Sequence, residues 1–253
     1  MKLIAHASRF VAARSVRLAV LALLAASPSA HALRPFDGTD ADVAKLGSFE
    51  LEAGVSQLRL GPQRQSSLPA LVGNWGIVAD TELVLEGVLD QRQGGVPAGE
   101  HSLVLDAAAL SVKHVFRRGS LQDESGVSVA TECSLLLPSI GAAPGTGFGC
   151  AAIASQRWDL VSVHLNAALD RTREHTNERT LSLIAEGSED WRLRPVSELM
   201  LVRGADGSRQ HSALLGAIYQ NTETLAFDLG YRHADGSAGR ANELRLGLTW
   251  SMP

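Results

Sequence analysis

The chain has 253 residues, of which 45% are hydrophobic and 20% are charged, and its net charge is −4. This length and apolar fraction suit one sizeable domain, and no charge block or Pro/Ser-rich linker divides the sequence. The net negative charge without a basic cluster excludes nucleic acid as an expected partner and argues against simple electrostatic docking on anionic lipid.

Residues 1–32 have the pattern of a secretory signal peptide. Four basic residues precede a short apolar run at 18–26, and Ala30-His31-Ala32 is a small-x-small cleavage site. The run is shorter than the roughly 20 apolar residues of a transmembrane helix. We therefore predict export, with cleavage after Ala32, which leaves 19 basic and 27 acidic residues and a net charge of −8.

Residues 33–47 combine turn formers with acids, and they predict a solvated, periplasmic N-terminal lead-in. Asp37, Asp40 and Asp42 suggest calcium binding, but the segment lacks the Asp-x-Asp-x-Asp-Gly order and the distal Glu of an EF-hand loop. We expect no metal site there.

From residue 48 onwards, apolar and polar residues alternate along the chain. Phe49, Leu51 and Val55 alternate with Glu50 and Glu52, which gives a β-strand one apolar and one polar face. Two glutamates on one strand face are unstable in an apolar core unless they are paired, but they are stable in a wet lumen.

The same alternation predicts further strands along the chain. In order, they cover 68–77, 81–91, 101–118, 127–137, a strand resuming at Cys150, 161–170, 181–186, 195–202, 212–219, 225–232 and 243–252. Asp106 interrupts the apolar face formed by Val104 and Leu110, which indicates a bulge or register change. Loops are expected at 91–99, 119–126, 138–149, 171–179 and 234–240, with a tight connection at 78–80 and a hairpin turn at 204–207.

These segments predict an all-β, up-and-down antiparallel transmembrane β-barrel over residues 48–253. Strands of about ten residues are long enough to cross a bilayer when tilted, and bacterial barrels have even strand numbers, so we predict twelve strands, with ten as the alternative. A soluble β-sandwich is the competing fold, although its strands are usually about five or six residues long. The low aromatic content of 5% predicts thin interfacial girdles.

Cys133 and Cys150 lie on the two arms of a predicted hairpin. Because exported proteins meet an oxidising compartment, the pair predicts a disulfide, with two free thiols as the alternative.

Several short motifs are spread over the predicted mature chain. They are Pro35-Phe36-x-x-x-Asp40-Ala41, Gly47-x-Phe49-Glu50-Leu51-Glu52, Asn74-Trp75-Gly76, Thr81-Glu82-Leu83, Ala217-Ile218-Tyr219, the stretch from Leu225 to Tyr231, and Gly247-Leu248-Thr249-Trp250. Together they resemble an outer-membrane β-barrel family labelled for the meta-pathway of phenol degradation. The resemblance implies an outer-membrane location and transport of small hydrophobic or aromatic compounds. The sequence departs from the usual terminal Phe of such barrels, because it ends Trp250-Ser-Met-Pro253. That departure predicts less efficient recognition by the barrel assembly machinery.

Charged and polar residues on the inward faces are the candidate lumen lining. They are Glu50, Glu52, Glu82, Glu86, Lys113, Arg117, Glu132, His164, Asp170, Asp228, Arg232, Glu243 and Arg245. In an open pore these side chains would select what passes. In the alternative, they pair with one another in a plugged lumen that conducts nothing.

An enzyme is the third hypothesis, since a lipid-modifying barrel needs Ser and His with an orienting polar group. Ser162, His164 and Asn166 share one strand face, but these residue types are also ordinary in a lumen. The sequence contains no Gly-x-Ser-x-Gly, His-Glu-x-x-His or phosphate-loop motif, and its histidines are scattered. We expect no enzyme, no cofactor and no metal.

The expected function is a channel or transporter for a small solute, and a non-conducting structural or surface barrel is the alternative. The expected partners are outer-membrane lipid, the barrel assembly machinery and a small-molecule solute.

Overall fold

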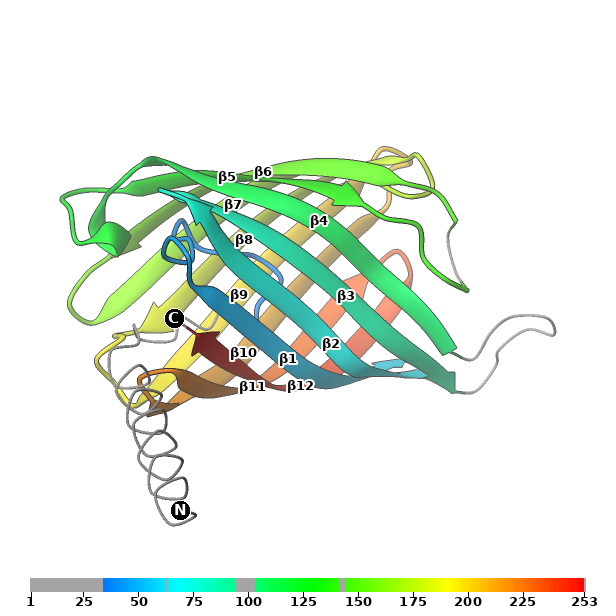
Figure 1. Ribbon diagram of the computed structural model, residues 1–253. Helices are drawn as coiled ribbons and strands as arrows, with labels where there is room; N and C mark the ends of the chain where they lie inside the picture. The colour runs from blue at the N-terminus through cyan, green and yellow to red at the C-terminus, as the bar shows by residue number, and fades with distance from the viewer. Residues whose placement is uncertain (1–33, 62, 94–102, 142–143, 253) are drawn as a thin grey trace, which may run out of the picture.

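The computed structural model describes residues 34–61, 63–93, 103–141 and 144–252, so the predicted signal peptide lies outside the described residues. Twelve strands follow one another along the chain (Figure 1). They are β1 Phe49–Leu60, β2 Gln63–Val78, β3 Thr81–Gln93, β4 Leu103–Arg117, β5 Ser128–Leu136, β6 Gly147–Arg157, β7 Val161–Arg171, β8 Asn177–Gly187, β9 Leu193–Gly204, β10 Arg209–Thr222, β11 Leu225–Gly236 and β12 Gly239–Met252. A short 3-10 turn, η1 Ser120–Gln122, lies between β4 and β5.

Each strand pairs antiparallel with the next, and β1 pairs with β12, so the sheet closes into a twelve-stranded up-and-down barrel (Figure 1). The predicted fold and the preferred strand number are therefore confirmed. Closure leaves no unpaired sheet edge, which is the condition for a β-structure inside a bilayer. No helix in the described part of the chain is long and apolar enough to cross a membrane.

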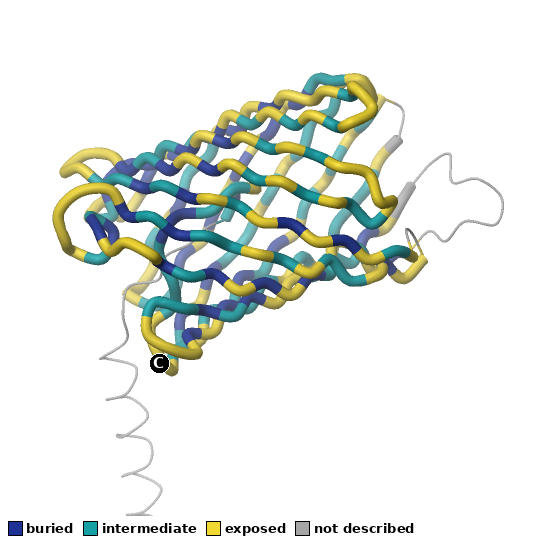
Figure 2. The backbone as a smooth tube through the Cα atoms, turned by 90° about the horizontal axis from the view of Figure 1, so that it is seen from above, coloured by how far each residue is buried: buried dark blue, intermediate teal, exposed yellow. Residues whose placement is uncertain are grey.

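Exposed and buried residues alternate along the strands (Figure 2). Leu229 of β11 lies directly opposite Leu246 of β12, and each is 48% exposed. On the other face of β11, Asp228 and Arg232 are buried. The wall is thus apolar outside and polar inside, as in an outer-membrane barrel.

Most strands extend further than their apolar alternation predicts. The predicted loop 234–240 is wrong, because β11 reaches Gly236 and β12 begins at Gly239. The loop predicted at 171–179 is shorter than expected, because β7 extends to Arg171 and β8 begins at Asn177. Polar residues continue the backbone ladder at these ends, where water replaces lipid and the outer face no longer needs to be apolar.

The register change predicted near Asp106 is confirmed. Glu86 pairs with Ala109 but Val88 pairs with Asp106, and the extra residue Ala107 has a positive φ of 51°. This bulge reverses the faces on its far side, so Val104, expected on the outer face, is buried.

The predicted disulfide is also confirmed. Cys133 of β5 lies directly opposite Cys150 of β6, and their sulfur atoms are bonded. The bond closes the hairpin whose loop spans 137–146.

Residues 34–46, here called the strap, run inside the barrel instead of extending into solvent (Figure 1). The expectation of a solvated lead-in is therefore wrong. The strap ends at a parallel bridge between Leu46 and Gly76 of β2. A Cβ atom at Gly76 would lie 2.1 Å from the carbonyl oxygen of Lys45, so only glycine permits this close approach.

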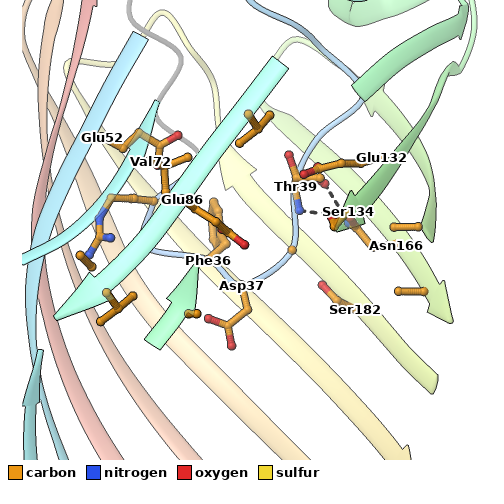
Figure 3. Close-up of a pocket in the computed structure, with 18 of the residues that line it drawn as sticks. Phe36, Asp37, Thr39, Glu52, Val72, Glu86, Glu132, Ser134, Asn166 and Ser182 are labelled. Atoms are coloured by element: carbon orange, nitrogen blue, oxygen red, sulfur yellow. Dashed lines mark hydrogen bonds between the residues drawn. The ribbon is translucent and has the colours of Figure 1, made fainter. Parts of the chain in front are cut away.

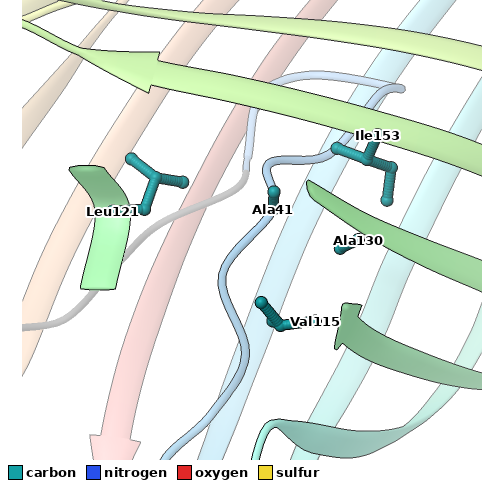
Figure 4. Packing of buried hydrophobic residues seen from close by; sticks show 5 residues of the cluster. All are labelled: Ala41, Val115, Leu121, Ala130 and Ile153. Carbon is teal, nitrogen blue, oxygen red and sulfur yellow. The ribbon is translucent and has the colours of Figure 1, made fainter. Parts of the chain in front are cut away.

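Two small apolar clusters hold the strap against the wall. Ala41 packs with Val115, Leu121, Ala130 and Ile153 (Figure 4). Near the other end of the strap, Phe36 packs against Val196, Ile218 and Ala226. The alternation placed Val115, Ala130 and Ala226 on inward faces, but it did not predict that a strap packs against them.

Candidate channel lumen

The strap divides the lumen into two cavities. The first half of the strap, Arg34 to Thr39, lines a cavity of about 530 Å³ that extends towards the β1–β2 and β9–β10 turns. The second half, with η1 and the turn at Asp80, lines a cavity of about 650 Å³ at the end of the barrel where β1 begins and β12 ends. We call them the loop-side cavity and the termini-side cavity.

The carboxylate of Asp37 bridges two arginines of the wall. Arg245 donates from Nη1 to Asp37 Oδ1 at 2.6 Å, and Arg232 donates from Nη1 to Asp37 Oδ2. Each arginine also binds a wall acid, because Arg232 Nη2 donates to Glu198 at 2.6 Å and Arg245 Nη2 to Glu243 at 2.7 Å. The wall therefore holds two guanidinium groups close together without an excess of positive charge.

Arg34 lies in a notch of the wall formed by two directly opposed glycines, Gly54 of β1 and Gly247 of β12. A Cβ atom at Gly54 would lie 2.1 Å from Nη2 of Arg34, so the guanidinium could not keep this position beside a side chain at residue 54. Nε of Arg34 is 3.7 Å from Asp228 Oδ2, which is longer than a hydrogen bond. Among the described residues, neither carboxylate oxygen of the buried Asp228 has a hydrogen-bond partner.

Wall side chains also bind the backbone of the strap. Asn166 pairs with both backbone groups of Thr39, accepting from its N–H at 3.1 Å and donating to its carbonyl oxygen at 2.8 Å (Figure 3). Glu198 accepts from the N–H groups of Asp37 and Gly38 at 3.1 and 2.8 Å.

Three more wall side chains continue this pattern towards the end of the strap. Ser155 Oγ accepts from the N–H of Ala41 at 2.9 Å, and Glu82 accepts from the N–H of Ala44 at 2.6 Å. Gln122 Nε2 donates to the carbonyl oxygen of Ala41 at 2.8 Å. These contacts supply the partners that buried backbone groups need away from water.

Lys113 is the most deeply buried cation of the lumen, with 1% of its side chain exposed. Its Nζ is 3.2 Å from Asp40 Oδ1, 3.6 Å from Glu82 Oε1 and 3.1 Å from Thr39 Oγ1. One ammonium group thus joins the strap to the wall between two carboxylates, which compensates for its removal from water.

The three aspartates considered for calcium each bind protein groups. Asp37 binds arginines, Asp40 binds Lys113, and Asp42 accepts from Gln122 at 2.9 Å. In the part of the chain that the structure describes, no group of three or more His, Cys, Asp or Glu residues could hold a metal ion.

His164 lies between two wall residues. Its Nδ1 is 2.8 Å from Ser155 Oγ, and its Nε2 is 2.9 Å from Glu186 Oε1. The partner is therefore Ser155 and not Ser162, which lies on the same strand as His164. The Ser–His–Glu order resembles a nucleophile with its base, but Ser155 is 1% exposed and is covered by the Ala41 N–H, so no substrate reaches it in this structure.

Acidic residues outnumber basic ones in the lining of the loop-side cavity. Glu86, Glu132 and Asp170 line this cavity on three different strands, together with Glu52 and Glu243. Figure 3 shows Glu52, Glu86 and Glu132 among the lining residues. Arg34 and Arg245 are the basic residues of the lining.

The termini-side cavity has basic residues at its mouth. Arg118 donates to Asp80 and Glu124, each at 2.7 Å, and Arg157 lines the same cavity. The hydrogen bond to Glu124, followed by the charge of Asp80, raises the pKa of Arg118. Deeper in this cavity, Glu50 accepts from Ser251 at 2.6 Å.

Twelve of the thirteen predicted lumen residues face the lumen. Glu50, Glu52, Glu82, Glu86, Lys113, Glu132, Asp170, Glu243 and Arg245 line the cavities, and His164, Asp228 and Arg232 contact the strap or its wall partners. Arg117 is the exception. A bulge between Val115 and Arg117 pairs it with Val129, and it is exposed and lines neither cavity.

Several lumen residues were not predicted. Glu198 holds the strap, and Arg194 lies in the wall at 4.0 Å from Glu186. The alternation placed Asn166 and Glu186 on inward faces but did not predict their contacts. Glu198 has a signal in the sequence, since it is an acid in the centre of an alternating strand. Arg34 and Asp37 have none, because nothing in the segment 34–46 indicates that a barrel encloses it.

Comparison with solved structures shows the fold of outer-membrane channels. The COG4313 outer membrane channel from Pseudomonas putida F1 matches with a TM-score of 0.63 and 11% identity, over 86% of this chain and 99% of that one. The NanC porin matches with a TM-score of 0.56 and 10% identity, and the KdgM porin with 0.53 and 12%, each over 79% of this chain and 98% of the other.

No protein-family model and no curated protein sequence matches the chain. The expectation of an outer-membrane channel barrel is therefore supported at the level of the fold, and the phenol-degradation label of the resembling family is not confirmed.

Proposed function

We propose that the protein is an outer-membrane channel for small hydrated solutes, that the strap holds its lumen closed, and that the acids of the loop-side cavity favour cations. The observation that carries the proposal is the pair of polar cavities that meet at the strap. Its apolar outer wall supports insertion in outer-membrane lipid through the barrel assembly machinery.

The lining favours hydrated solutes over the hydrophobic or aromatic compounds that the family resemblance implied. Glu86, Glu132 and Asp170 are separate carboxylates on the cavity wall, and a ring of acids attracts cations and repels anions. An apolar solute would leave these charges without water.

The contacts between strap and wall also favour the non-conducting alternative, so the test must distinguish the two. We would measure the conductance and the reversal potential of the full-length protein in planar bilayers, under a KCl gradient. The full-chain variant Arg34→Ala/Asp37→Ala removes the two charged anchors of the strap and should conduct more than the wild type, with a preference for K⁺.

Adding Glu86→Gln, Glu132→Gln and Asp170→Asn to this variant should weaken the cation preference and preserve conductance. Thr180→Ala, which changes an uncharged residue of the same cavity, is the matched control. If neither wild type nor the strap variant conducts after correct assembly, the protein is a non-conducting barrel.

A further inference from the structure

The contacts that hold the first half of the strap do not depend on its side chains alone. Glu198 binds two consecutive backbone N–H groups, and Asn166 binds the N–H and the carbonyl oxygen of Thr39. Arg245 donates to the carbonyl oxygen of Pro35 at 2.8 Å. Only a bent backbone can direct two consecutive N–H groups to one carboxylate, and residues 34–38 form a turn and bend, so this part of the wall recognises a bent peptide backbone.

Two charged positions flank these backbone contacts. Arg232 and Arg245 converge on one carboxylate, that of Asp37. Asp228 lies beside the glycine notch that holds the guanidinium of Arg34, three residues earlier in the chain. The wall is therefore complementary to a basic residue followed, three positions later, by an acidic one.

The strap does not satisfy this wall completely. Asp228 is 5% exposed, and neither of its carboxylate oxygens has a hydrogen-bond partner among the described residues, because Arg34 approaches no closer than 3.7 Å. A ligand that donates directly to Asp228 would gain a charge-assisted hydrogen bond that the strap lacks. This unsatisfied carboxylate distinguishes the wall from one built only to hold the strap.

The same surface is reached from the loop-side cavity. Phe36, Asp37 and Thr39 line that cavity (Figure 3), and 35% of the Asp37 side chain is exposed. A solute in the cavity thus meets the strap at the position of its carboxylate contact and competes with it there.

We propose that the lumen wall formed by Asn166, Glu198, Asp228, Arg232 and Arg245 is a binding site for short peptides that adopt the bent backbone of the strap and carry a basic residue three positions before an acidic one. The strap occupies this site in the absence of such a peptide. The inference rests on the proposed function, because it requires solutes to enter the lumen. A simple anion would not suffice, since it makes none of the backbone contacts that Glu198 and Asn166 make to the strap.

The test measures binding of fluorescein-labelled peptides by fluorescence anisotropy to the full-length protein in detergent. The probes are Arg-Pro-Phe-Asp-Gly-Thr-Asp, Arg-Ala-Ala-Asp-Ala-Ala-Ala and the charge-exchanged Asp-Ala-Ala-Arg-Ala-Ala-Ala. In the variant Arg34→Ala/Asp37→Ala, the first two should bind at least about tenfold more tightly than the third, and more tightly than to the wild type, where the strap competes.

Second-site variants in this background separate the two kinds of contact. Asn166→Ala should weaken both matched peptides by about tenfold, whereas Arg245→Gln should reduce the advantage of the matched peptides over the charge-exchanged one. Thr180→Ala, which lines the cavity without a hydrogen bond to the strap among the described residues, should leave all three affinities unchanged. Gel mobility of unboiled samples verifies that each variant is folded.

The outcomes distinguish this inference from the proposed function. Equal affinity for matched and charge-exchanged peptides, or no saturable binding, overturns the peptide site even if the strap variant conducts. Selective binding without any conductance supports the site and contradicts the channel.

Discussion

At the scale of single residues, the direction of a side chain decides whether a charge is tolerated. Leu229 and Leu246 oppose each other on the outer face, while their sequence neighbours Asp228 and Arg245 face the lumen. Leu→Arg at either outward position should prevent assembly, at a cost of about 2–4 kcal/mol near the bilayer midplane. Asp228→Asn and Arg245→Gln should assemble, as measured by the fraction of protein whose gel mobility changes on boiling.

If all four variants assembled equally well, the assignment of the two faces would be wrong. The wild-type protein in the same outer-membrane fraction is the reference for each comparison.

A second residue-scale prediction concerns Lys113. Replacing it with Met leaves the carboxylates of Asp40 and Glu82 without this cation, and breaking such a buried pair typically costs about 3–5 kcal/mol. We expect Lys113→Met to lower the midpoint of thermal unfolding in detergent. Lys45→Met is the matched control, because Lys45 is exposed and should change stability by less than about 0.5 kcal/mol. Equal midpoints for the two variants would contradict a stabilising role for Lys113.

At the scale of elements, the strap and β2 meet at Gly76. A Cβ atom there would lie 2.1 Å from the carbonyl oxygen of Lys45 and 2.5 Å from that of Ala44, so Gly76→Ala should push the end of the strap off the wall. The barrel ladder should persist, since β2 pairs with β3 through backbone groups. We expect higher conductance and faster proteolysis of the strap, with unchanged assembly.

Gly87→Ala is the matched control for Gly76→Ala, because the nearest atom to a Cβ at Gly87 is 3.9 Å away, at ordinary contact distance. It adds the same methyl group to the neighbouring strand β3. An identical response of conductance in both variants would show that the effect does not arise at the strap.

At the scale of the whole molecule, closure of β1 on β12 gives a barrel that has no edge from which to unfold. The protein in an outer-membrane fraction should therefore migrate differently in unboiled and boiled samples in detergent. The absence of a shift, with the protein in the soluble periplasm, would contradict the membrane location proposed here.

The sequence by itself determined the strand periodicity, the twelve-stranded barrel, the Cys133–Cys150 pairing and most inward charges, because alternation with period two assigns each residue to a face without knowledge of distant contacts. It failed where the backbone departs from that period. Bulges reversed the faces of Val104 and Arg117, and bulges depend on pairing with a neighbouring strand.

Only the tertiary structure decided what fills the lumen. Residues 34–46 have the composition of a solvated segment, and their polar groups become stable inside the barrel because Asn166, Glu198, Arg232 and Lys113 supply partners from strands more than 70 residues away. A local pattern shows that Asp37 is polar, but not that two arginines lie opposite it. Pairing of β11 with β12 brings those arginines together, and enclosure of the strap places Asp37 against them to form the candidate site.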